Sequence, residues 1–200
     1  MEAYSNVFGE KREEILGQFS HWKTRMLTPL LFVLDRLGLT ADALSLLSFS
    51  CAIGCAIVVS RHVGLACAFL VGHAILDGFD GSLARYQQRV SKNGAFMDFS
   101  ADQASLVVIT LAFLTTGSIP ILWGAWYLST YLIMVPFLVF LNHLRGKPVK
   151  TVIRSRFLFY ILFFVDYYFG LATVPAFLLV FSLYNTVVCF ILFRNIRCLL

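Results

Sequence analysis

Residues 77–102, DGFDGSLARYQQRVSKNGAFMDFSAD, place four aspartates within apolar sequence. Asp77 and Asp80 are three residues apart, and Asp98 and Asp102 are four apart, so each pair shares one face of a helix. A charged group near the centre of a bilayer costs about 2.5–3.5 kcal/mol even on the more lenient insertion scales. Four such groups in one short stretch therefore indicate a function that requires them.

The sequence around this stretch is typical of a membrane protein. Of its 200 residues, 59% are hydrophobic and 14% are charged, whereas a soluble domain carries roughly 25% charged residues. Lipid offers no partners to free backbone groups, so apolar segments of about 20 residues should cross the bilayer as helices. The sequence predicts an all-α integral membrane protein with six transmembrane helices, at about 42–60, 63–84, 95–117, 119–142, 153–170 and 173–193.

Lysine and arginine divide unevenly between the two ends of these helices. Of the 16 basic residues, only Arg61 lies on one side; the others precede the first span or lie in the second-to-third connection, the fourth-to-fifth connection and the C-terminal tail. Basic loops remain on the cytoplasmic side of a membrane. Both termini and the aspartate-bearing ends are therefore expected to face the cytoplasm. The formal charge of +5 indicates topology rather than a nucleic-acid partner.

The first 36 residues have a different pattern. Apolar residues recur at helical spacing between charged ones, which predicts an amphipathic helix lying in the cytoplasmic interface. A helix that binds a partner protein is the alternative. The chain is thus expected to have two parts, an interfacial helix over 1–36 and a six-helix membrane domain over 37–200.

The two aspartate pairs are expected to converge on metal ions. The connection 86–93 is short enough to make its two helices antiparallel neighbours, with both pairs near the cytoplasmic ends. Facing carboxylates repel one another unless cations lie among them. Oxygen ligands without histidine or cysteine favour Mg²⁺ or Mn²⁺.

Small and basic residues beside the aspartates fit a phosphate site. Gly81 and Ala84 leave room for a ligand, and Arg85 could hold a diphosphate at the cytoplasmic end. Gly94 opens the next helix and would leave free N–H groups there. Each feature has a simpler interpretation: a small-residue packing stripe, a snorkelling arginine, or aspartates lining an ion path.

The joint pattern resembles a known family. Asp77-x-x-Asp80-Gly81-x-x-Ala84-Arg85, then eight residues, then Gly94-x-x-x-Asp98-x-x-x-Asp102, is similar to the signature of the CDP-alcohol phosphotransferases at all eight fixed positions. The six spans and the N-terminal amphipathic helix also resemble that family. Residues 38–44, GLTADAL, lack the proline and asparagine of the family's usual opening, which leaves the subfamily open.

The resemblance implies a reaction and roles for individual residues. A phosphatidyl-type group would move from a CDP-linked lipid, such as CDP-diacylglycerol, to a small polar alcohol with release of CMP, in phospholipid biosynthesis. Two Mg²⁺ or Mn²⁺ ions would be held by Asp77, Asp80 and Asp98, with Asp102 completing the site as catalytic base or only as ligand. The nucleotide and diphosphate would bind along Gly81, Ala84, Arg85 and Gly94.

The acceptor is less defined by the sequence. In relatives that use phosphorylated alcohols, basic residues near the start of the fifth span bind the acceptor phosphate, and Arg154 and Arg156 are similar in placement. Ordinary cytoplasmic charge is the alternative interpretation. Members of the family commonly form homodimers.

Two other functions compete with this one. A related enzyme could use CDP-choline or CDP-ethanolamine with diacylglycerol as acceptor, although those relatives tend to be longer. An ion-coupled transporter could use the intramembrane aspartates. Such carriers often contain internal repeats, and residues 110–200 hold no second copy of the acidic stretch.

Overall fold

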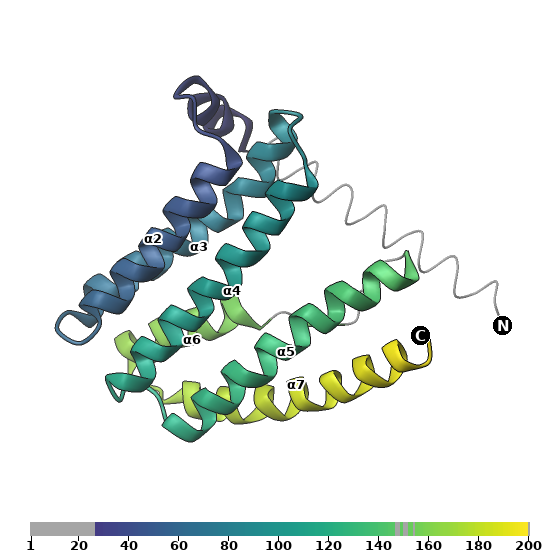
Figure 1. Ribbon diagram of the computed structural model, residues 1–200. Coiled ribbons are helices and arrows are strands. Elements are labelled where there is room, and N and C mark those ends of the chain that lie inside the picture. The colour runs from purple at the N-terminus through teal and green to yellow at the C-terminus, as the bar shows by residue number, and fades with distance from the viewer. Residues whose placement is uncertain (1–26, 147–148, 150–151, 154, 200) are drawn as a thin grey trace.

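All regular secondary structure in the described part of the chain is helical (Figure 1). The computed structural model describes residues 27–146, 149, 152–153 and 155–199. A helix over the described residues 27–36 precedes six longer elements. These coincide with the six predicted spans, and they are α2 (Ala41–Val58), α3 (Val63–Tyr86), α4 (Lys92–Thr115), α5 (Ile121–Arg145), α6 (Arg156–Phe169) and α7 (Thr173–Arg197).

Five of these helices are long and apolar enough to cross a membrane, namely α2, α3, α4, α5 and α7. Helix α6 has 14 residues, or about 21 Å at 1.5 Å per residue, against a hydrocarbon core of about 30 Å. The all-α membrane class is therefore confirmed. A sixth crossing stays a prediction, because α6 is shorter than the predicted span 153–170.

The helices form two groups that meet around α6. Helix α2 packs against both α3 and α4, while α5 packs along α7 (Figure 1). Helix α6 contacts α3 and α7, and α4 contacts α5. Helices α3 and α4 are not among the closely packed pairs of the described chain, although the short connection predicted direct neighbours. Both pack against α2, and residues of both helices line one cavity, so space remains between the two acidic faces.

Helices α5 and α7 run in the same direction. The indole Nε1 of Trp126 donates to Thr186 Oγ1 at 3.1 Å, and the rings of Phe137 and Phe193 lie 6.3 Å apart. Residue numbers rise together along the pair, so the end of α5 and the start of α7 lie at opposite ends of the bundle. The chain between them must therefore return along its length.

Part of that return is not helical. Val149 N–H donates to Asn142 Oδ1 at 2.7 Å, and Ile153 N–H donates to the Tyr184 hydroxyl at 3.0 Å. We call the described residues 149, 152, 153 and 155 the anchored segment. The predicted span began at 153, but the helix begins at Arg156, because side chains of α5 and α7 satisfy the backbone here.

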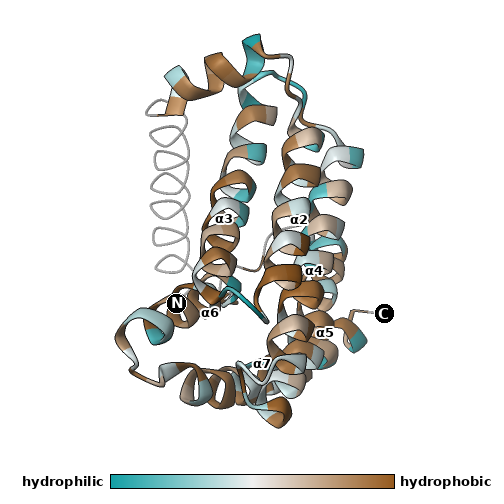
Figure 2. Ribbon diagram, turned by 90° about the vertical axis from the view of Figure 1, so that its left-hand side faces the viewer, coloured by the Kyte–Doolittle hydropathy of each residue, from teal (hydrophilic) through white to brown (hydrophobic). Residues whose placement is uncertain are grey.

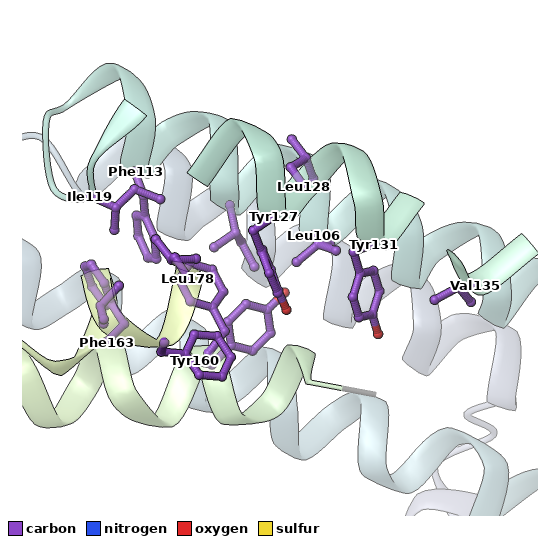
Figure 3. Packing of buried hydrophobic residues seen from close by; sticks show 14 of the residues in the cluster. Leu106, Phe113, Ile119, Tyr127, Leu128, Tyr131, Val135, Tyr160, Phe163 and Leu178 are labelled. Atoms are coloured by element: carbon purple, nitrogen blue, oxygen red, sulfur yellow. The ribbon is translucent and has the colours of Figure 1, made fainter. Parts of the chain in front are cut away.

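Aromatic packing fixes α6 in the bundle (Figure 3). Phe163 of α6 stacks on Phe113 of α4 with ring centroids 3.8 Å apart. Phe159, one turn earlier, stacks on Phe177 of α7 and lies 5.5 Å from the ring of Tyr127 on α5. Each such pair contributes about 0.5–1.5 kcal/mol beyond its buried area. The short helix is thus held by three neighbours.

The helix over residues 27–36 lies across the ends of α2 and α3 (Figure 2). Leu31 is fully buried against Leu44 of α2 and Leu83 of α3. Gln87, at the end of α3, donates to Asp35 Oδ1 at 2.8 Å. Large apolar side chains on the other face of this helix are exposed. Residues 1–26 of the predicted interfacial helix lie outside the described residues.

Candidate functional site

Three carboxylates converge between α3 and α4. One oxygen each of Asp77, Asp98 and Asp102 lies within 4.8 Å of the others. The predicted spacing explains this, since each aspartate pair occupies one face of its helix. A group of carboxylate oxygens without histidine or cysteine matches the ligand preference of Mg²⁺ and Mn²⁺. The residues present therefore fit a hard divalent ion.

Asp80, the fourth predicted ligand, is held by its own hydrogen bonds. Its Oδ2 accepts from Ser45 Oγ of α2 at 2.8 Å, and its Oδ1 accepts from the Gly81 N–H. Both side chains are buried. Sequence reasoning did not single out Ser45. A weak signal was available, because Ser45 and Ser48 are three residues apart and so lie on one face of a mainly apolar helix.

Arg156 contacts the acidic cluster directly. Its Nη1 lies 2.6 Å from Asp102 Oδ1, and its Nη2 lies 3.1 Å from Asp77 Oδ2. Arg156 is 7% exposed, and its guanidinium carbon lies 4.7 Å from the ring centroid of Phe157. One of the two predicted acceptor arginines thus points inward. The other, Arg154, lies outside the described residues.

Six of the eight signature residues line one cavity. This motif cavity, of about 320 Å³, lies at the ends of α2, α3 and α4. It brings together Gly81, Ala84, Arg85 and Gly94, the four residues predicted to bind the nucleotide and diphosphate. Asp80 and Asp98 also line it, and so do residues that the sequence did not single out for this role, namely Asp42, Ser45, Arg89 and Ser91.

Gly94 contributes space rather than a free donor. Its N–H donates to Ser91 Oγ at 2.9 Å, so this one N–H of the helix start is not free for a ligand. Ser91 is the N-cap of α4, and serine at that position commonly takes such an N–H. A Cβ at Gly94 would lie 3.2 Å from Ser91 Oγ and 3.4 Å from Asp42 Oδ1. A side chain here would therefore crowd the wall of the motif cavity.

A second cavity lies on the other side of the carboxylates. This arginine cavity, of about 210 Å³, is lined by Arg156 and by all four aspartates. Asp80 and Asp98 line both cavities. These carboxylates therefore lie between the motif cavity and the arginine cavity. Gln103 and Tyr131 also line the arginine cavity. Sequence reasoning missed both, since nothing local marks a residue whose role depends on packing between helices.

Carboxylates that can hold divalent ions suit the transfer of phosphoryl groups. A comparison of the sequence with known families identifies the class of protein. The sequence profile described as CDP-alcohol phosphatidyltransferase matches residues 38–193. The chain belongs to this family, and it is a membrane-bound phosphotransferase of phospholipid biosynthesis. The description of the family names a phosphatidyl-type transfer that uses a CDP-linked alcohol. No curated protein sequence matches the chain.

Solved structures share the fold at low identity. One is Mycobacterium tuberculosis phosphatidylinositol phosphate synthase (PgsA1) with CDP-DAG bound, at 17% identity and a TM-score of 0.69 over 86% of this chain and 93% of that chain. The same enzyme in complex with manganese and citrate gives 16% identity and a TM-score of 0.69 over 85% and 88%. These likenesses concern the fold of the membrane domain.

Proposed function

We propose that this enzyme transfers a phosphatidyl group from a CDP-diacylglycerol-like donor to a small polar alcohol, with release of CMP, at two Mg²⁺ or Mn²⁺ ions. The observation that carries the proposal is the acidic cluster of Asp77, Asp98 and Asp102 with its cavities on either side. Family membership supports the reaction class. The similar enzyme with CDP-DAG bound supports the donor.

The motif cavity would receive the cytidine diphosphate end of the donor. Arg85 lines it and supplies a cation for the diphosphate. Because Gly81, Ala84 and Gly94 have little or no side chain, the ligand can approach the backbone there. The lipid tails of the donor would remain in the surrounding bilayer.

Asp77, Asp80, Asp98 and Asp102 would hold the metal ions. Divalent ions at such a site neutralise diphosphate charge and stabilise the leaving oxygen. The similar enzyme in complex with manganese supports this choice of ion. Ser45 would keep the Asp80 carboxylate turned toward the cluster.

The arginine cavity would receive the acceptor alcohol. Its hydroxyl oxygen would form a bond to the lipid-bearing phosphorus, and the bond from that phosphorus to the CMP oxygen would break. Asp102 would take the hydroxyl proton as general base; the alternative is that Asp102 serves only as a ligand. Arg156 would bind an acceptor phosphate, which favours a phosphorylated alcohol over serine.

The predicted topology is part of the same proposal. The parallel course of α5 and α7 supports a return crossing by the anchored segment and α6 together, which makes six crossings. The active site and both termini would face the cytoplasm, and residues 1–36 would form an interfacial helix ahead of a membrane domain over 37–200. A homodimer is the expected assembly.

The test is CMP release by the purified protein with CDP-diacylglycerol and one alcohol at a time. The panel comprises inositol phosphate, glycerol phosphate, inositol and serine, each with Mn²⁺ or Mg²⁺. We expect release with a phosphorylated alcohol and formation of the matching lipid. Release with CDP-choline and diacylglycerol instead would reverse the roles of donor and acceptor. The absence of release from any donor would contradict the proposed function.

A further inference from the structure

The contacts that Arg156 makes depend on where its helix begins. It is the first residue of α6, and the anchored segment before it is not helical. A long side chain at the end of a helix loses considerable rotamer freedom when it is ordered. Its two ion pairs, to Asp77 and Asp102, therefore depend on what fixes the start of α6.

Ser155, the residue before Arg156, does not serve α6 as an ordinary cap. It stands at the N-cap position, where a serine side chain usually accepts a hydrogen bond from the first turn. Its side chain makes no such bond. Its Oγ instead lies 3.0 Å from the hydroxyl of Tyr127 on α5. Ser155 thus ties the start of α6 to another helix.

Tyr127 is a rigid partner for this contact. Its side chain is fully buried, as is Ser155. Its ring packs against Phe159 of α6 at 5.5 Å and Phe177 of α7 at 5.9 Å between centroids. Figure 3 shows the ring extending from α5 beside that of Tyr131. Close packing on several sides leaves the hydroxyl of Tyr127 little freedom to move.

A second tyrosine supports the same segment. The Tyr184 hydroxyl of α7 accepts the N–H of Ile153, two residues before Ser155. Two hydroxyls from two helices therefore hold Ile153 and Ser155, which precede Arg156. Of these, the Tyr127 contact is the nearer to the arginine along the chain and is fully buried.

We infer that Tyr127 is a positioning residue for the anionic acceptor: its hydroxyl acts through Ser155 to hold Arg156 in the arginine cavity. The inference rests on the proposed function, since Arg156 is the acceptor-phosphate ligand there. Tyr127 itself lines neither the motif cavity nor the arginine cavity. Its removal should therefore weaken acceptor binding and leave donor binding unchanged.

The experiment measures KM for each substrate and kcat in Tyr127→Phe, Ser155→Ala and the double variant. It uses CDP-diacylglycerol with inositol phosphate or glycerol phosphate, whichever the unaltered enzyme accepts. We expect each single change to raise the acceptor KM about five- to tenfold, because a net hydrogen bond is lost, with the donor KM within about twofold. The double variant should be no worse than either single one, because both remove the same contact. Ser155→Thr should restore the acceptor KM.

Two further comparisons separate positioning from general stability. Thr186→Val removes the Trp126 hydrogen bond between α5 and α7 and should change neither KM. In an Arg156→Gln background, Tyr127→Phe should have no further effect on the acceptor KM.

A Tyr127→Phe enzyme that lost thermal stability or kcat without a change in acceptor KM would overturn the inference. So would an effect that persists in the Arg156→Gln background. Lack of CMP release by the unaltered enzyme with every acceptor would instead overturn the proposed function, and this inference with it.

Discussion

Nη1 of Arg156 lies 2.6 Å from Oδ1 of Asp102, so a cation from α6 enters the carboxylate cluster of α3 and α4. The same guanidinium reaches Asp77 at 3.1 Å. Arginine can bridge two carboxylates because its donors form a planar fork. This contact connects the proposed acceptor cavity with the carboxylates proposed to hold the metal ions.

Arg156→Gln should make the protein depend more strongly on divalent ions for its stability. Breaking a buried ion pair by removing one partner costs about 3–5 kcal/mol, and bound Mn²⁺ would supply the missing positive charge. We expect Mn²⁺ to raise the melting temperature of Arg156→Gln more than that of the unaltered protein, each compared with its value in EDTA. Arg145→Gln, at the exposed end of α5, is the control. Equal shifts in all three proteins would contradict this role of Arg156.

Ser45→Ala should weaken the metal site without abolishing the reaction. The change removes the hydroxyl that donates to Asp80 Oδ2 at 2.8 Å, and outer hydrogen bonds of this kind typically contribute 10–100-fold to metal affinity or activity. We expect the Mn²⁺ concentration for half-maximal activity to rise about tenfold, with full activity recovered at high Mn²⁺. Ser50→Ala, an exposed serine of the same helix, should leave the Mn²⁺ dependence unchanged. An unchanged Mn²⁺ requirement in Ser45→Ala would show that Asp80 needs no such support.

Gly94→Ala should impair donor binding specifically. The added Cβ would lie 3.2 Å from Ser91 Oγ, so the wall of the motif cavity must shift. We expect the KM for CDP-diacylglycerol to rise several-fold, with the acceptor KM little changed, as measured by CMP release. Gly38→Ala is not a matched control, because Gly38 has a φ of +72°. Gly72→Ala is better suited, because its added Cβ would lie 3.7 Å from Cys51 Sγ, an ordinary contact, and Gly72 lines neither cavity; it should leave both KM values unchanged. A donor KM that stays constant in Gly94→Ala would contradict the placement of the nucleotide.

Asp166→Ala should lower stability without affecting the chemistry. The carboxylate accepts hydrogen bonds from Thr173 N–H and Oγ1 and from Val174 N–H, at 2.6–2.7 Å. It thus satisfies the first turn of α7, at the opposite end of the bundle from the cluster. We expect a loss of about 1–3 kcal/mol, measured as a lower melting temperature, with the KM values of the folded enzyme unchanged. Changed KM values would indicate that this end of the bundle communicates with the site.

The sequence predicted what depends on local spacing. The helices coincide with the predicted apolar runs, and the carboxylates converge because three- and four-residue spacing places each pair on one helix face. The inward turn of Arg156 could not be derived, because it depends on where α6 begins. That position is set by Tyr127 and Tyr184, which come from helices distant in sequence. The sequence pattern places residues 153–155 at the start of the span as helix and cannot detect these partners.

The most direct test of the central claim is the metal dependence of CMP release. The purified enzyme is treated with EDTA, and Mn²⁺ is then returned in the presence of CDP-diacylglycerol and the preferred acceptor. Asp98→Asn and the exposed control Asp35→Asn are treated in parallel. We predict that Mn²⁺ restores activity to the unaltered enzyme and to Asp35→Asn, while Asp98→Asn loses at least about a hundredfold. Full activity in EDTA, or normal activity of Asp98→Asn, would contradict a metal site at the acidic cluster.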